Sequence, residues 1–151
     1  YRGKSDWKFI RSVKEAVNIP VIGNGDVTSL DDVTEMLALS GADGVMIGRG
    51  ACGRPWFLKQ VIEFLKTGRR TDAPSLGEQH AMLREHYDSM LSHFGSDIGV
   101  RVARKHISWY SKGLPKSAEF RATVNASGDG NTVRRAMDTF YLGLRDRSEA
   151  A

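Results

Sequence analysis

The chain has 151 residues, of which 40% are hydrophobic and 26% are charged, and its formal net charge is +4. This length suffices for one ordinary domain core or for two small units. No apolar run approaches the roughly 20 residues needed to cross a bilayer, which excludes a membrane-spanning helix. The single cysteine, Cys52, rules out an internal disulfide, and the four scattered histidines lack the spacing of a zinc site. Composition therefore predicts a soluble cytoplasmic protein without a metal.

The first seventy residues alternate helices with strands. Two apolar segments, 19–27 and 44–48, each run into a glycine-rich loop and are predicted to be short buried strands. A helix is predicted before the first strand, over 6–18, and another after the second strand, over 56–68. A third lies between the strands and runs from a capping box at Ser29 and Asp32 to about Gly41. Buried strands that alternate with amphipathic helices belong to a parallel sheet. Two strands cannot complete one, so they either pair with another chain or, more simply, close a TIM (β/α)8 barrel that was cut before Tyr1.

The remaining residues indicate a second, all-α domain. A polar, turn-rich segment places the domain boundary near residue 70, so that 1–70 is the barrel portion and 71–151 is helical. Four helices are predicted, from a capping box at Ser75 and Glu78 to Gly95, then over 98–112, 117–126 and 131–145. Their short connections favour a compact helical bundle. The isolated chain is expected to fold poorly, because its two strands would expose apolar faces.

Both strands end in loops suited to binding a phosphate group. The first is Gly23-Asn24-Gly25-Asp26 and the second is Gly48-Arg49-Gly50. In a TIM barrel, the loops after strands 7 and 8 frequently form a phosphate site. Glycines let backbone N–H groups approach the phosphate, and Arg49 can add a charge-assisted hydrogen bond. Three simpler interpretations stay open: ordinary turns, Asp26 as a helix cap, and Arg49 paired with a carboxylate. Cys52 is more simply a small buried residue than a catalytic one.

The predicted helix over 98–112 has a basic face. Arg101, Arg104, Lys105, Ser108 and Lys112 fall within about one third of its circumference, and no acid interrupts the row. Such a face is typical of contacts with an RNA phosphate backbone, although a soluble helix that happens to be basic is the alternative. The other side of the helix carries His106, Trp109 and Tyr110, which are expected to pack in the core.

Three segments, IPVIGNGDV, GADGVMIGRGACGRPW and RVARKHISWY, together resemble the bacterial tRNA-dihydrouridine synthase family, in particular its B-type branch. The resemblance implies an FMN enzyme that uses NADPH to reduce the C5–C6 double bond of uridines in tRNA. It also implies that FMN is contacted by Asn24, Gly25, Asp26, Gly48 and Arg49. The helical domain is expected to hold the tRNA, through the basic residues Arg101, Arg104, Lys105 and Lys112.

The chain departs from the family pattern in one respect. The family's catalytic cysteine, in an Asn-x-Gly-Cys-Pro segment, its active-site lysine and its His-Gly-Arg-Thr motif all precede the matched part, and none occurs here. Cys52 does not stand at the catalytic position. The chain is therefore expected to lack a catalytic residue and to need the N-terminal half of the barrel as a partner. Two alternatives stay open: a stand-alone RNA-binding module, and an FMN-dependent barrel reductase of small molecules.

Overall fold

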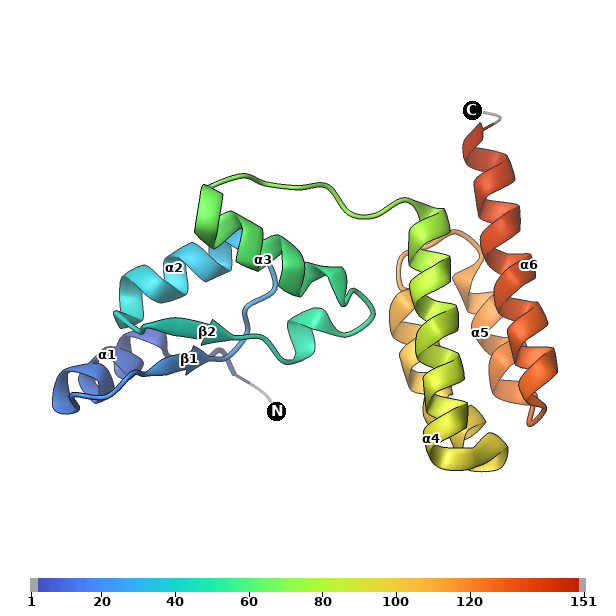
Figure 1. Cartoon of the computed structure of the whole chain (residues 1–151), viewed down its shortest axis with the longest axis horizontal. Helices are drawn as coiled ribbons and strands as arrows, with labels where there is room; N and C mark the ends of the chain where they lie inside the picture. Colours follow the sequence, from blue (N-terminus) through green and yellow to red (C-terminus); the bar gives the residue numbers. More distant parts are fainter. Residues whose placement is uncertain (1–2, 150–151) are drawn as a thin grey trace. The chain divides into compact units, whose positions relative to one another are not determined.

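The structure is a computed structural model that describes residues 3–149, and side chains as far as residue 147. The chain divides into two compact units, Tyr1–Ala73 and Pro74–Ala151 (Figure 1). Among the described residues it is mostly helical, with six α-helices and two short strands. No helix in this range is both long enough and apolar enough to cross a membrane. Because the units are separate compact bodies, each is considered by itself.

Unit 1 contains a parallel pair of strands packed against helices. Its elements in order are α1 (Trp7–Ala16), β1 (Ile22–Asn24), α2 (Leu30–Ser40), β2 (Gly44–Met46), the 3-10 turn η1 (Arg49–Ala51) and α3 (Trp56–Thr67). The strands pair in parallel, with Ile22 opposite Gly44, as the sequence predicted. Each strand is only three residues long, shorter than its apolar segment.

The helix between the strands has the boundaries that its capping residues predicted. The Ser29 hydroxyl accepts a hydrogen bond from the Asp32 backbone N–H at 3.1 Å, and the Asp32 carboxylate accepts one from the Ser29 backbone N–H at 2.8 Å. The helix ends at Gly41, whose φ of 64° is left-handed and favours glycine. These bonds satisfy backbone groups that a helix end would otherwise leave unpaired.

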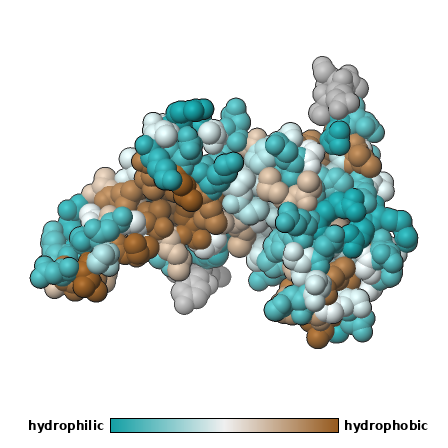
Figure 2. All heavy atoms as spheres, viewed as in Figure 1, coloured by the Kyte–Doolittle hydropathy of each residue, from teal (hydrophilic) through white to brown (hydrophobic). Residues whose placement is uncertain are grey.

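The core of unit 1 covers one side of the sheet and leaves other apolar faces open. A buried cluster joins α2 and α3 to the loop after β1 and consists of Val27, Val33, Met36, Phe57 and Val61. Helix α1 has no buried residue. Large apolar side chains are exposed on α1, both strands and α3, including Phe9, Val13, Ile22, Met46, Leu58 and Ile62. Figure 2 shows a broad hydrophobic area over this unit. The expectation of exposed apolar faces is confirmed.

Unit 2 is formed by α4 (Leu76–Tyr110), α5 (Ser117–Ala126) and α6 (Gly130–Glu149). Helix α4 is interrupted at Gly95, where φ is 75° and ψ is 165°, and the chain turns back there (Figure 1). The two arms of α4 pack closely, since a Cβ at Gly99 would lie 2.9 Å from the Leu91 Cα. The predicted break at Gly95 is confirmed, and the two predicted helices are the two arms of α4 on either side of it.

Candidate functional site

The loops after β1 and β2 leave the sheet at the same edge, because the strands are parallel and Asn24 lies opposite Met46. These loops are the two glycine-rich segments singled out from the sequence. Asn24, the last residue of β1, and Gly48, just before η1, are both exposed. A Cβ at Gly48 would meet no heavy atom within 4 Å, so the backbone here is open to an approaching anion.

The first loop requires glycine at position 25. Its φ is 132°, and a Cβ there would lie 2.5 Å from the Cβ of Ser5, in the segment that precedes α1. The Trp7 indole N–H donates to the Gly25 carbonyl oxygen at 2.9 Å. Ser5 therefore holds the loop after β1 by close packing, and Trp7, the first residue of α1, holds it by a hydrogen bond.

Asp26 joins three parts of the site. One carboxylate oxygen accepts from the Ser5 backbone N–H at 2.9 Å, and the other accepts from the Arg49 guanidinium at 2.9 Å. The Ser5 N–H, and then the charge of Arg49, hold the pKa of Asp26 below its usual value, so the carboxylate is ionised at neutral pH. Its backbone is left-handed, with φ at 55°. The interpretation of Arg49 as the partner of a carboxylate is therefore correct in this structure.

Arg54 fastens the second loop to the first. Its guanidinium donates to the Gly50 carbonyl oxygen at 2.7 Å and also to the Thr28 carbonyl oxygen. Gly50 is buried, and a Cβ there would overlap the Val27 carbonyl oxygen. The 3-10 turn thus packs directly on the backbone that follows β1. The two glycine loops form one connected structure.

Arg49 remains available to a ligand despite its pairing. Its side chain is 77% exposed, and only one edge of the guanidinium contacts Asp26. A guanidinium has five N–H donors in a planar fork, so the others can bind phosphate oxygens. Exposed amide, glycine backbone and guanidinium groups are donors that suit a phosphate. The residues present therefore fit the phosphate end of a cofactor such as FMN.

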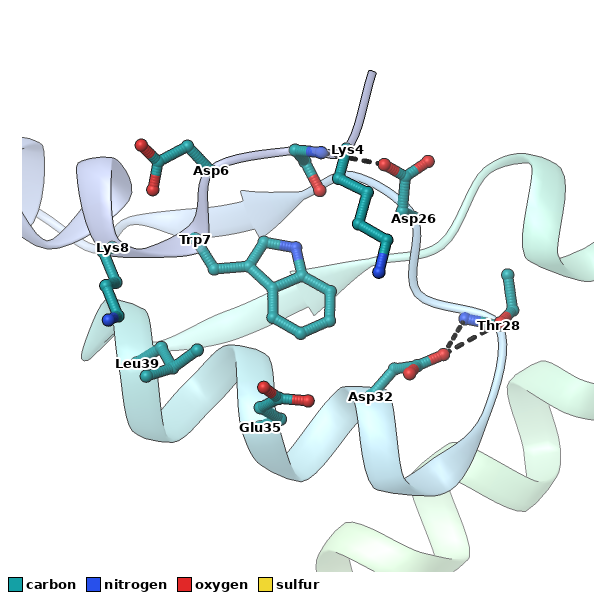
Figure 3. Close-up of a pocket in the computed structure, with 10 residues that line it drawn as sticks. Lys4, Asp6, Trp7, Lys8, Asp26, Thr28, Asp32, Glu35 and Leu39 are labelled. Atoms are coloured by element: carbon teal, nitrogen blue, oxygen red, sulfur yellow. Dashed lines mark hydrogen bonds between the residues drawn. The ribbon is translucent and has the colours of Figure 1, made fainter. Parts of the chain in front are cut away.

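A hollow of about 500 Å³ lies beside the first loop (Figure 3). The Trp7 indole lines it, together with Asp32 and Glu35 of α2 on one side and Lys4 and Asp26 on the other. Asp26 alone among the predicted cofactor residues lines it. The hollow therefore adjoins the glycine loops but is distinct from the edge where Asn24 and Arg49 are exposed.

Of the basic row, Arg101, Arg104 and Lys105 lie on the second arm of α4, in unit 2, whereas Lys112, predicted on the same helix, lies in the turn that follows the helix end at Tyr110. Arg101, Lys105 and Lys112 are exposed, as expected for a cationic face. The Lys105 ammonium also lies 5.0 Å from the centre of the Trp109 ring, a cation–π contact that orients it. Arg104 differs: it is half-buried, and its guanidinium donates to the Ser127 carbonyl oxygen at 3.0 Å. Arg104 therefore ties the arm to the end of α5 and is not a free surface cation.

The residues behind the basic row pack as expected. Tyr110 is buried, and the His106 ring lies edge-on to Trp109 at 5.1 Å and to His86 of the first arm at 4.8 Å. Burial, then the charges of His86 and Lys105, lower the pKa of His106. His106 is therefore neutral at physiological pH and joins the two arms of α4.

Comparison with known proteins identifies the family. A family model described as "Dihydrouridine synthase (Dus)" matches residues 1–141. The chain belongs to the dihydrouridine synthase family. It is 50% identical over 149 residues to a probable tRNA-dihydrouridine synthase of Rickettsia conorii, covering 99% of this chain and 45% of that protein. It is 42% identical over 149 residues to tRNA-dihydrouridine synthase B of Pseudomonas putida, covering 99% and 44%.

The resemblance that the sequence motifs indicated is thus confirmed. A third relative, tRNA-dihydrouridine synthase B of Xanthomonas axonopodis, is 44% identical over 125 residues, covering 83% of this chain and 38% of that protein. This dihydrouridine synthase chain spans less than half the length of the relatives it matches.

The sequence singled out the residues on the two glycine loops but missed those that hold them in place. Ser5, Trp7 and Arg54 connect the loops of this dihydrouridine synthase chain through hydrogen bonds. Ser5 and Trp7 lie about twenty positions before the loop that they contact, and nothing in their spacing marks them. Arg54 follows the second glycine loop closely, and its position in GRP was the one available signal.

Proposed function

We propose that this chain is the C-terminal part of a cytoplasmic, FMN-dependent tRNA-dihydrouridine synthase, which uses NADPH to reduce the C5–C6 bond of uridines in tRNA. One observation carries the proposal: two glycine loops of a dihydrouridine synthase chain meet at one sheet edge and present Arg49 and Asn24 to solvent. FMN, when bound, supplies the hydride-transfer chemistry. Unit 1 supplies part of its phosphate site, and unit 2 supplies a tRNA-binding surface.

Within the phosphate site, each residue has a role that its contacts support. Gly48 leaves the backbone open to the phosphate, Gly25 lets the first loop pack against Ser5, and Asn24 and Arg49 donate hydrogen bonds to the phosphate. Asp26 is ionised and would repel a phosphate directly, so it serves the cofactor by holding Arg49 and the loop. Arg54 keeps the loops at a fixed separation.

We further propose that unit 1 forms the last strands of a TIM barrel. Its exposed apolar side chains on α1, the strands and α3 support this, because they are the surfaces that neighbouring barrel elements would cover. The family's catalytic cysteine would then lie in the N-terminal half of the barrel, so this chain alone lacks a proton donor for the substrate carbon. In unit 2, Arg101, Lys105 and Lys112 contact tRNA phosphates, and Arg104 anchors the arm that carries Arg101 and Lys105.

The test uses the full-length protein, purified and incubated with NADPH and a tRNA transcript that lacks dihydrouridine. We expect FMN to be released from the protein by heat and dihydrouridine to appear in the transcript by mass spectrometry. Arg49→Gln should weaken FMN binding, whereas the matched control Arg69→Gln, an exposed arginine of unit 1 just after α3, should not. A protein that contains FMN and oxidises NADPH with small enones but leaves tRNA unmodified would be a small-molecule reductase. One that binds tRNA without FMN would be an RNA-binding module.

A further inference from the structure

Residues 68–72, which follow α3, are bonded to side chains of α2 and α3. They belong to the polar segment 68–75 that joins α3 to α4, and residues 68–73 are all exposed. A segment of this composition would by itself be a flexible tether. It begins at Gly68, whose φ of 73° is left-handed and whose backbone N–H donates to the Phe64 carbonyl oxygen at 2.8 Å. This cap ends α3 and turns the chain away from the helix axis.

Gln60 of α3 holds the backbone of this segment. Its half-buried side-chain amide donates to the Thr71 carbonyl oxygen at 2.7 Å and to the Asp72 carbonyl oxygen at 3.0 Å. Both N–H groups of the amide are thereby used. Water could satisfy carbonyl oxygens on an exposed segment equally well, so the fold of α3 does not require these two bonds. What they determine is the path of the chain after the helix.

Arg70 attaches the same segment to unit 1 at a second point. Its guanidinium donates to the carboxylate of Asp31, in the first turn of α2, and lies 5.3 Å from the centre of the Phe64 ring. The two charged side chains are 57% and 76% exposed, and exposed ion pairs contribute little to stability. The pair therefore fixes the segment more than it stabilises unit 1. We call residues 68–72, held by Gln60 and Asp31, the strap.

The end of the joining segment is bonded to unit 2 instead. The Gln79 side-chain amide donates to the Pro74 carbonyl oxygen at 2.7 Å, and Ser75 caps α4. Bonds to unit 1 thus end at Asp72 and bonds to unit 2 begin at Pro74, with Ala73 between them in the described part of the chain. The proline ring fixes its own φ and disfavours helical backbone at the residue before it. The flexible part of the connection is therefore about one residue long.

We propose that Gln60 and Arg70 are positioning residues, which hold the pivot of the tRNA-binding unit on unit 1 and so restrict which uridine reaches the flavin. The inference rests on the proposed function, in which tRNA is held by unit 2 and reacts at unit 1. The effective concentration of a tethered group falls with about the −3/2 power of tether length. Releasing the strap would lengthen the tether from about one residue to about eight, which dilutes the target uridine by up to about twentyfold. Other uridines would then come within reach.

The experiment measures single-turnover formation of dihydrouridine by the full-length protein, with NADPH and an unmodified tRNA transcript. In the double variant Gln60→Leu with Arg70→Gln, the rate should fall about three- to twentyfold. Mass spectrometry of RNase fragments should then find dihydrouridine at uridines that the wild type leaves unmodified. FMN content and flavin reduction by NADPH without tRNA should stay unchanged, because the strap is bonded to α2 and α3 and not to the glycine loops. Arg69→Gln, an exposed neighbour of Arg70, is the charge-matched control.

A second variant lengthens the joint and leaves the strap intact. Insertion of Gly-Ser-Gly-Ser between Ala73 and Pro74 should lower the rate and broaden the set of modified uridines in the same way. A wild-type rate and wild-type modification sites in either variant overturn the inference and leave the proposed function intact. An equal loss of dihydrouridine formation and flavin reduction in the double variant also overturns it, because that result indicates a purely structural role. If the double variant fails to fold, as judged by circular dichroism, the insertion decides. A wild type that forms no dihydrouridine overturns the proposed function itself.

Discussion

Replacing Gly50 by alanine tests whether the two glycine loops form one connected structure. The new Cβ would overlap the Val27 carbonyl oxygen and lie 3.2 Å from a methyl group of Ile47. The first neighbour is backbone and cannot rotate away, so one loop must move. Overpacking of this kind costs about 1–3 kcal/mol. Displacing the Gly50 carbonyl oxygen, which accepts a hydrogen bond from Arg54, would cost roughly 1 kcal/mol more. We expect the free energy of unfolding to fall by about 2–4 kcal/mol.

Urea unfolding of the full-length protein measures this loss, and fluorescence titration with FMN measures its effect on the site. FMN affinity should fall together with stability, because moving the turn also moves Arg49. Gly143→Ala is the matched control: Gly143 lies inside α6, a Cβ there would meet only the end of a flexible arginine side chain, and the change should stabilise by about 0.5–1 kcal/mol. A Gly50→Ala protein as stable as the wild type would refute the close packing of the loops.

Three further predictions concern charged groups. If Asp26 acts through Arg49, Asp26→Asn should weaken binding of FMN but not of riboflavin, which has no phosphate. The same substitution should have no effect on FMN binding in an Arg49→Gln background. Equal effects on both ligands would show that Asp26 contacts the ligand directly. Arg104→Gln should destabilise the protein by about 1–2 kcal/mol in urea unfolding, whereas exposed Arg101→Gln should change stability by less than about 0.5 kcal/mol; equal effects would contradict the anchoring role. Burial lowers the pKa of His106 below its ordinary 6.5, so the unfolded chain binds the proton more readily than the folded chain. The free energy of unfolding should therefore fall as pH decreases through 6.5 toward the lowered pKa. His106→Gln should reduce this dependence of the free energy of unfolding on pH.

Local patterns in the sequence determined much of this architecture. The capping boxes at Ser29 and Ser75 and the left-handed Gly41 each depend on residues within a few positions of one another, so their spacing alone predicted where helices begin and end. The end of a predicted helix at Gly95 likewise gave the break in α4. The alternation of buried strands with amphipathic helices predicted the parallel pairing. The positions of the two glycine loops, and of the basic row, were likewise determined by the sequence.

Only the tertiary structure decided how these pieces are connected. The hydrogen bonds of Asp26 to Ser5 and to Arg49 span 21 and 23 positions, and that of Arg104 to Ser127 spans 23. No helical or strand period relates residues so far apart, so helix and strand patterns could not place a carboxylate between two loops. They likewise assigned Arg104 to a solvated face, because a helical wheel contains no information on the neighbouring helix that accepts its hydrogen bond. The sequence by itself determined which residues stand at the site, and packing between distant segments decided which of them are held and which remain open to a ligand.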